Sequence, residues 1–218
     1  MAFHLRQACF LLLVALLSLQ LTSGLAAATG RGDIGVYWGR NKYEGTLREA
    51  CDTGLYNTVM ISFLSAFGHG KYTLDLSGHS ETGYDIGNDI KHCQSKKILV
   101  LLSIGGQGGE CGFPDQRLEK ALDTGLFDRV HVKLFGEDRK CMATPRESWE
   151  KWSAAYPRSK VFVGVVASPD TAAAPAGYLS PRELYYRVLQ FVMKRRNYGG
   201  IVIWNRYFDK NTHFSSAL

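Results

Sequence analysis

The chain has 218 residues, and its 26 lysine and arginine residues against 20 aspartate and glutamate residues give a formal net charge of +6 at pH 7. This length allows one domain with a substantial core, but it falls short of the roughly 250 residues typical of an eight-stranded α/β barrel. The basic residues are scattered and do not alternate with aromatic ones, which argues against a nucleic-acid partner.

The N-terminus has the composition of a secretory signal peptide. Arg6 precedes an apolar run from Cys9 to Leu21, and mostly small residues follow up to Ala28. We expect residues 1–27 to be removed, which leaves residues 28–218 as one soluble, secreted domain with a net charge of +5. A membrane anchor is the weaker interpretation because the apolar run is too short to span a bilayer, so no membrane partner is expected.

The cysteines indicate disulfides rather than a metal site. Cys51, Cys93, Cys111 and Cys141 remain after the signal peptide, and an even set in an oxidising compartment predicts two disulfides, in any of three pairings. No Cys-x-x-Cys spacing is present, and the histidines are dispersed along the chain. We therefore expect neither a metal nor another cofactor.

The first half of the chain predicts alternating strands and helices. Thr46 and Glu49 have the spacing of a capping box, which begins a helix that Gly54 ends. The other expected elements before residue 98 are a strand at Asp33–Trp38, a strand at Asn57–Leu64, a long polar loop at Ser65–Tyr84 and a helix with Ile86, Ile90 and Cys93 on one face.

The third strand lies at the point on which the function depends. Ile98–Ile104 is an unbroken apolar run, which predicts a strand buried on both faces. Gly105 and Gly106 then allow a turn at the carboxyl end of the strand, where parallel α/β barrels carry their chemistry. The chain passes directly from there into a glycine-rich stretch around Glu110 and Cys111 and a new helix.

The second half repeats the same alternation and completes six strands. A second capping box, at Ser180 and Glu183, begins a helix that we expect to reach about Arg196. The order βαβα predicts a parallel sheet with helices outside, a (β/α)8 TIM-barrel type truncated to about six βα units and not necessarily closed. The further elements expected are a helix at Asp115–Thr124, a strand at Asp128–Phe135, a helix at Ser148–Tyr156, a strand at Lys160–Ala167 and a strand at Ile201–Trp204.

Several stretches together carry a family likeness. The matching stretches are Gly35–Asn41, Glu44–Cys51, Leu74–His79, Asp89–Cys93, Ser103–Gly106, Ala121–Val132, Trp152–Tyr156 and Tyr198–Lys210. In these the chain resembles plant class III chitinases of glycoside hydrolase family 18, and most of all the cereal xylanase inhibitor branch of that family. The resemblance implies that Cys51 pairs with Cys93 and that Cys111 pairs with Cys141.

The same resemblance identifies what is missing. Family members have a fourth strand that ends in an Asp-Gly-x-Asp-x-x-x-Glu type motif, whose glutamate is the general acid, and no stretch of this sequence supplies it. Asp85 and Asp89 fall on a predicted helix, and Glu110 has no aspartate two residues away. A tyrosine of the family is replaced by Phe135. We expect no chitinase turnover, because losing a general acid alone costs roughly 10²- to 10⁴-fold in rate.

Two groups of residues are candidates for binding. Tyr37 and Trp204 at strand ends, with Asn41 in the loop after the first strand, can form the floor of a sugar cleft. The alternative is that Tyr37 and Trp204 are core or rim residues of the barrel and Asn41 is a solvated loop residue. Chitin oligosaccharides are the partner that the first interpretation implies.

The second group is the basic end of the last long helix. By the resemblance, Lys194 takes the position of a lysine that enters the acidic cleft of a microbial xylanase, with Arg195 beside it and Arg182 near the start of the helix. The alternative is that these cations only complement the helix dipole. A second inhibitory loop of that branch falls inside the missing segment, so action on a second structural class of xylanases should be lost.

These observations predict a catalytically inactive plant defence protein of the apoplast that inhibits microbial xylanases. A non-catalytic chitin-binding protein is the second hypothesis, and an active chitinase is the third. The sequence is also consistent with a degenerate copy or an incomplete gene, because removing two βα units leaves unpaired strand edges.

Overall fold

The computed structural model describes residues 30–68, 70–77, 79, 86–104, 116–136, 143–171 and 177–218. The chain divides into two compact units, Met1–Arg31 and Gly32–Leu218, and the second contains every helix and strand described here. The expected signal peptide therefore lies outside the described residues. None of the described helices combines the length and apolar character needed to cross a bilayer.

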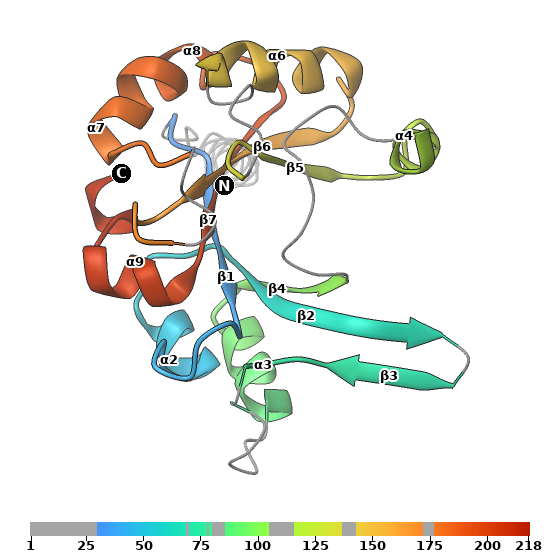
Figure 1. The fold of residues 1–218 in the computed structure, drawn as a ribbon, viewed down its shortest axis with the longest axis vertical. Helices are drawn as coiled ribbons and strands as arrows, with labels where there is room; N and C mark the ends of the chain where they lie inside the picture. Colours follow the sequence, from blue (N-terminus) through green and yellow to red (C-terminus); the bar gives the residue numbers. More distant parts are fainter. Residues whose placement is uncertain are drawn as a thin grey trace, which may run out of the picture. The chain divides into compact units, whose positions relative to one another are not determined.

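Six parallel strands form the sheet of the second unit, and a seventh short strand joins it as a hairpin (Figure 1). The parallel strands are adjacent in the order β4-β2-β1-β7-β6-β5, and β3 pairs with β2 in the antiparallel sense. The strand bounds are β1 Asp33–Trp38, β2 Thr58–Gly68, β3 Lys71–Leu74, β4 Leu99–Ile104, β5 Arg129–Lys133, β6 Lys160–Val166 and β7 Tyr198–Trp204.

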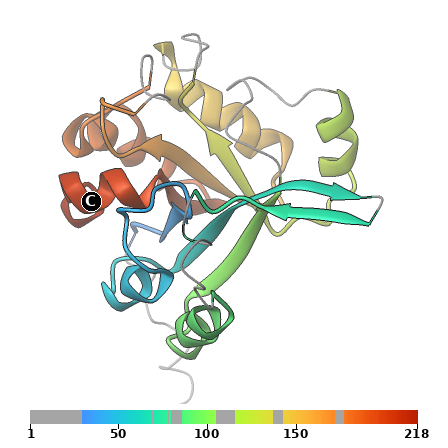
Figure 2. The ribbon, with the colours of Figure 1, turned by 60° about the horizontal axis from the view of Figure 1, so that its bottom comes forward.

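The sheet is a barrel that does not close within the described residues. β1 pairs with β7, so the first and last strands are joined as in a complete (β/α) barrel, whereas β4 and β5 each have one neighbour and lie at the two edges. Figure 2 shows the curled sheet with its helices outside. The prediction of six βα units of TIM-barrel type is confirmed, and the opening falls between β4 and β5.

The helices follow the local signals in the sequence closely. Both capping boxes are present, with Thr46 accepting from the amide of Glu49 and Ser180 from that of Glu183. The last long helix contains a π-helical turn and ends its regular part at Val192, earlier than the predicted Arg196. The helix bounds are α2 Leu47–Asp52, α3 Ile86–Ser95, α4 Gln116–Leu122, α6 Pro145–Ala155, α7 Pro181–Leu184, η2 (π) Tyr185–Leu189, α8 Gln190–Val192, α9 Arg206–Thr212 and the 3₁₀ turn η3 Ser215–Ala217.

The predicted loop at Ser65–Tyr84 is wrong in its first part. β2 continues to Gly68, and β3 returns along it, so the chain forms a hairpin where a polar loop was expected. The hairpin has Gly70 at its turn with φ +77°, a conformation that favours glycine. The sequence gives little signal because the second strand of the hairpin is short and only partly apolar.

The main core lies between the sheet and the surrounding helices. Val36, Trp38 and Val163 are completely buried there, together with Trp149 from α6 and Leu184 from α7. A smaller cluster fills the inside of the curled sheet, where Met60, Phe162 and Val202 are each 2% exposed. Both sides of the central strands are therefore packed.

The prediction that Ile98–Ile104 is buried on both faces is wrong. Leu99 is 39% exposed, Leu102 is 51% exposed and Ile104 is 62% exposed. The apolar run does form a strand, but β4 has only β2 beside it in the described structure. On the side away from β2, the described part of the chain places no strand that would bury it.

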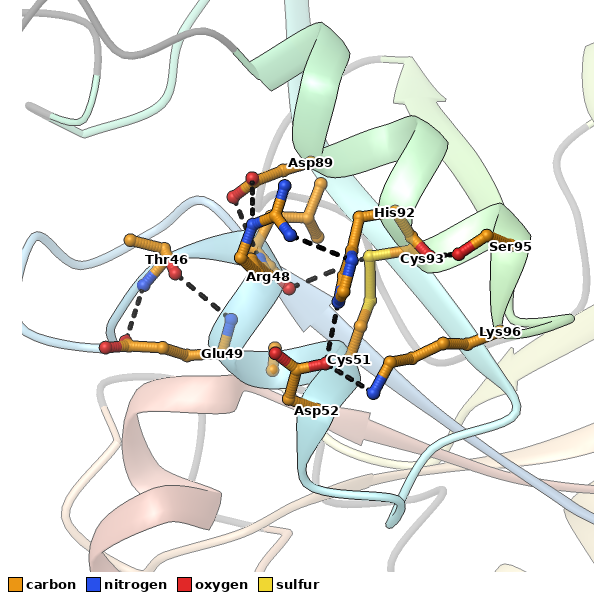
Figure 3. Close-up of a disulfide and its surroundings, with 12 residues drawn as sticks. Thr46, Arg48, Glu49, Cys51, Asp52, Asp89, His92, Cys93, Ser95 and Lys96 are labelled. Atoms are coloured by element: carbon orange, nitrogen blue, oxygen red, sulfur yellow. Dashed lines mark hydrogen bonds and ion pairs between the residues drawn. A yellow bond between two sulfur atoms is a disulfide. The ribbon is translucent and has the colours of Figure 1, made fainter.

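A disulfide joins α2 to α3, as Figure 3 shows, and it confirms the expected pairing of Cys51 with Cys93. Both cysteines are buried, so the bridge lies within the helix layer that covers β1 and β2. The other expected pair, Cys111 with Cys141, lies outside the described residues.

A buried polar cluster holds the C-terminal segment against the start of β2. The Tyr56 hydroxyl donates to the Asp209 carboxylate, which also accepts from the amide of Ser215 at 2.6 Å and from its hydroxyl at 2.7 Å. Arg206 donates to the Tyr56 oxygen at 3.3 Å. Burial, followed by the Asp209 charge, raises the pKa of the Tyr56 hydroxyl.

Candidate functional site

An aromatic cluster closes the carboxyl end of the sheet. The Trp204 ring lies 5.1 Å from the Tyr37 ring and is stacked on Phe63 at 5.8 Å, both measured between centroids. Phe135 and Val166 complete the cluster. Trp204 is 5% exposed, and burial raises the pKa of the Tyr37 hydroxyl. Two of the three predicted sugar-binding residues are thus in contact, and in this packing Trp204 exposes little of its ring.

The loop after β1 is held by a buried glutamate that the sequence analysis did not single out. Glu44 is completely buried, and its Oε1 accepts hydrogen bonds from the amides of Gly39 at 2.9 Å and Asn41 at 2.8 Å. The His79 ring lies 3.2 Å from the same oxygen. The signal available was an acidic residue within a short glycine-flanked turn, which is where carboxylates often accept backbone amides.

Arg40 and Asn41 also form contacts at the carboxyl end of the sheet. The Arg40 guanidinium bonds the Asp75 carboxylate at 2.8 Å and lies 5.3 Å above the Phe63 ring. This hydrogen bond, followed by one from the amide of Ser77, lowers the pKa of Asp75. The side-chain oxygen of Asn41 accepts from the amide of Tyr43 at 2.9 Å, so this side chain takes part in holding its own loop.

The carboxylates described at this end of the sheet are not arranged as a catalytic pair. Asp75 is held by Arg40 and Ser77, while Glu44 is held by backbone amides and lies beside His79. No recorded contact joins these two acids within the described residues. Glu110 lies outside them. Asp89, which the sequence placed on a helix, is on α3 and binds Arg48.

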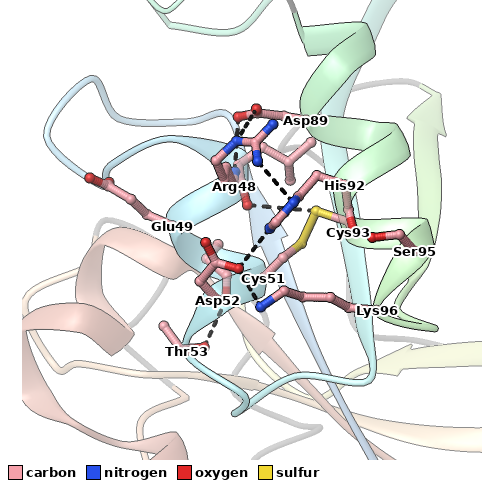
Figure 4. Close-up of polar contacts among 12 residues, drawn as sticks. Arg48, Glu49, Cys51, Asp52, Thr53, Asp89, His92, Cys93, Ser95 and Lys96 are labelled. Atoms are coloured by element: carbon pink, nitrogen blue, oxygen red, sulfur yellow. Dashed lines mark hydrogen bonds and ion pairs between the residues drawn. A yellow bond between two sulfur atoms is a disulfide. The ribbon is translucent and has the colours of Figure 1, made fainter.

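A second polar cluster joins α2 and α3 beside the disulfide, as Figure 4 shows. Arg48 bonds Asp89 at 3.0 Å and the His92 ring at 2.8 Å, and His92 lies 2.7 Å from Asp52. Hydrogen bonds from Lys96 and then His92 hold the pKa of the Asp52 carboxyl at about 2. Each charge has an opposite charge beside it, so this cluster binds two helices together. The described residues contain no group of three or more potential metal ligands.

The helix formed by α7, η2 and α8 presents a surface of aromatic and basic side chains, and its place beside α6 is shown in Figure 1. Tyr185 is 47% exposed and Tyr186 is 57% exposed, with their rings edge to face at 5.3 Å. The Arg182 guanidinium lies 5.9 Å from the Tyr186 ring. The sequence analysis did not single out these two tyrosines. Two adjacent large aromatic residues in a helix point in different directions, so they could have indicated that at least one ring is exposed.

The three predicted contact residues of this helix have different surroundings. Arg195 donates to Glu150 of α6 at 2.7 Å, and this hydrogen bond is the main reason that the pKa of Glu150 is lowered. Lys194 is exposed and follows the last regular turn of α8, and no ion pair of Lys194 is recorded within the described residues. Arg182 lies twelve residues earlier, about 18 Å away along a helix. The structure therefore places Lys194 and Arg195 together and Arg182 at the other end.

Comparison with known proteins identifies the family. A rice xylanase inhibitor protein, number 2, is 40% identical over 84% of this chain and 88% of its own length. The rice xylanase inhibitor protein XIP is 38% identical over 98% of this chain and 99% of its own length. The chain belongs to the plant chitinase-like xylanase inhibitor family. Plant endochitinases are also similar to this chain, at 30% identity or lower. No family model matches.

The fold of the inhibitor family is confirmed by a solved structure. The xylanase and alpha-amylase inhibitor protein XAIP-II of Scadoxus multiflorus superposes with a TM-score of 0.76 at 27% identity, over 85% of this chain and 97% of its own. The alignment with rice XIP runs over 294 positions, so at least 76 of them have no residue in this 218-residue chain. Because that alignment covers 98% of this chain and 99% of rice XIP, these positions are gaps within it.

Proposed function

We propose that the chain is a secreted, catalytically inactive chitinase-like protein of plant defence that inhibits microbial xylanases in the apoplast. The observation that carries the proposal is the helix α7–η2–α8, which is complete in this truncated barrel and exposes Lys194 at its basic end. The names of the relatives support xylanase as the partner. A cation that enters a cleft lined by two catalytic carboxylates is electrostatically matched and excludes substrate.

Two features support the absence of catalysis. The sequence has no Asp-Gly-x-Asp-x-x-x-Glu motif, and β4 and β5 are edge strands at the place where the acid-bearing strand of family 18 belongs. Phe135, in place of the family tyrosine, packs among Trp204 and Phe63. We expect the pure protein to release no chitooligosaccharides from chitin, and measurable release that depends on protein concentration contradicts this part of the proposal.

The inhibition itself is tested by a panel of microbial xylanases with a matched pair of variants. Lys194→Ala removes the exposed cation, and Lys91→Ala removes an exposed lysine from α3, on another element. We expect Lys194→Ala to raise the inhibition constant by at least about tenfold, because about 1.4 kcal/mol of binding free energy corresponds to that factor. Lys91→Ala should leave it unchanged. Full inhibition by Lys194→Ala removes that residue from the contact, and no inhibition by the wild type removes the function.

The exposed pair Tyr185 and Tyr186 offers a second possible contact with a xylanase on the helix α7–η2–α8. Tyr and Arg are, with Trp, the residues enriched among those that dominate protein interfaces, and Tyr186 and Arg182 lie together near the start of the helix. Glu183, the acidic residue beside them, is held in the capping box by Ser180, which lowers the pKa of its carboxyl. We expect the single variants Tyr186→Ala and Arg182→Ala each to weaken xylanase inhibition.

An alternative function is binding of chitin oligosaccharides without cleavage. The aromatic cluster of Tyr37 and Trp204, with Asn41 in the loop beyond it, supports this proposal, whereas the 5% exposure of Trp204 weakens it. Pull-down on chitin beads at increasing protein concentration tests it. Retention that chitin oligosaccharides release, and that Lys194→Ala does not change, favours this function over inhibition.

A further inference from the structure

The free edge of β4 has backbone groups directed away from the sheet. The amide of Leu99 donates to the carbonyl of Asn57 at 2.9 Å, and the register pairs Leu99 with Thr58 and Leu101 with Met60. In a parallel pair, one residue turns both its N–H and its C=O to the same neighbour, and the next residue turns both away. Up to Ser103 the odd-numbered residues of β4 therefore bond β2, and Val100 and Leu102 turn their backbone to the side on which no strand lies within the described residues. At Ile104 the register shifts, with Leu64 of β2 opposite it.

The side chains on this edge are apolar and exposed. Leu102 is 51% exposed and Ile104 is 62% exposed, and an open apolar pocket of about 310 Å³ lies beside them. The residues from Leu99 to Ile104 include no charge and no proline. Natural edge strands are usually protected from pairing by such residues, by bulges or by a covering element. The pocket is lined in part by Ile61, Leu74, Ile86, Ile90, Val100 and Leu102.

We infer that β4 is an interface with a second copy of this chain, and that the two β4 strands pair in the antiparallel sense about a two-fold axis. The axis keeps the sheet continuous only if residues of the same parity face each other, and Val100 and Leu102 carry the backbone groups that have no strand partner in the described part of the chain. Leu102 of one copy then lies opposite an even-numbered residue of the other. Exposed leucine and isoleucine side chains of the two copies cover one another and the pocket.

The composition of the two edges favours pairing of β4 with β4 over pairing of β4 with β5 of another copy. On β5 the described side chains are the buried Val130 and Val132, or the polar Arg129, His131 and Lys133, so this edge offers no exposed apolar surface to Leu102. Parallel pairing would also bring the basic start of β4, at Lys97, towards Arg129. A head-to-tail contact of this kind leaves a further free edge, whereas the two-fold contact is closed.

The test is the mass of the full chain in solution, measured by sedimentation velocity over a range of concentrations. We expect a dimer that dissociates on dilution. Leu102→Lys places two like charges at the centre of the contact and should sediment as a monomer where the wild type is a dimer. Leu126→Lys changes the same residue type at an 83% exposed position between α4 and β5, and it should remain dimeric.

Residue-resolved hydrogen exchange keeps the proposal testable if Leu102→Lys does not fold. The amides of Leu101 and Ser103 should be protected at all concentrations because they bond β2, whereas those of Val100 and Leu102 should be protected only in the dimer. A monomer at every concentration, or larger assemblies that Leu102→Lys leaves unchanged, overturns the inference. Equal protection of the even-numbered amides in dilute and concentrated samples does so as well.

Discussion

β4 and β6 have nearly the same kind of sequence and very different surroundings. Both are short runs rich in valine, leucine or isoleucine, and both form parallel strands. Every residue of β6 after Lys160 is buried, because β5 and β7 flank it and α6 packs on it, whereas three residues of β4 are at least 39% exposed. An apolar run therefore specifies a strand, and its neighbours decide whether that strand is core or surface.

The largest difference between the two strands should appear on truncating a side chain. Phe162→Ala in β6 removes a ring that is 2% exposed and packs on Met60 and Val202, and it should lower the free energy of unfolding by about 3–5 kcal/mol. Leu102→Ala in β4 should cost about 1 kcal/mol or less, because half of its side chain is already in water. Urea unfolding of dilute samples measures both. Equal costs would show that β4 is buried in solution.

The disulfide should matter more for the exposed strand than for the covered one. Cys51 and Cys93 close a loop with a sequence separation of 42 and fix α3, which packs against β4. Replacing both with alanine should lower the free energy of unfolding by about 3–4 kcal/mol. Hydrogen exchange should speed up in β4 before it does so in β6. A uniform change across the sheet would contradict this division.

The other edge strand should make stability depend on acid. His131 of β5 has a buried Nε2 without a partner in the described structure, and burial, followed by the Arg129 charge, lowers the pKa of its ring to about 4. An unfolded histidine has a pKa near 6.5, so the unfolded chain binds more protons between pH 6.5 and pH 4. As pH falls through this window, the free energy of unfolding should therefore decrease by up to about 3 kcal/mol.

A variant isolates the contribution of that ring. His131→Phe keeps an aromatic side chain against Phe162, whose ring lies 4.8 Å from that of His131, and removes the titrating group. The difference in unfolding free energy between the wild type and this variant should change between pH 6.5 and pH 4 and be constant above pH 7. A difference that stays constant throughout this range contradicts the assignment.

The smallest effect on stability is expected in the helix layer that packs on the covered strand β6, at the ion pair that joins α6 to the end of α8. Glu150→Gln weakens the contact with Arg195, whose side chain is 54% exposed, and should change the free energy of unfolding by about 0.5 kcal/mol. The same change releases Arg195 beside Lys194. We therefore expect xylanase inhibition to change more than stability does, and an unfolding loss near that of Phe162→Ala would be inconsistent with a surface pair.

Local chemistry was predictable from the residues themselves, whereas contacts between distant segments were not, apart from the pairing of Cys51 with Cys93 that the family resemblance implied. The capping boxes at Thr46 and Ser180 depend on residues three positions apart, and both are present. The exposure of Leu102, the burial of Trp204 and the pairing of Arg195 with Glu150 each depend on segments far along the chain. The hairpin of β2 and β3 was missed because its returning strand is short and only partly apolar.

The first and last strands of the sheet are joined to each other, while the opening of the barrel lies between β4 and β5. β1 pairs with β7, and Tyr56 and Asp209 join the start of β2 to α9, and none of these contacts involves a residue of β4 or β5. The stretch between β4 and β5 is then a natural acceptor for a transplanted cassette of two βα units. Grafting such a cassette from a relative there would rebuild the closed form without disturbing any strand pairing described here.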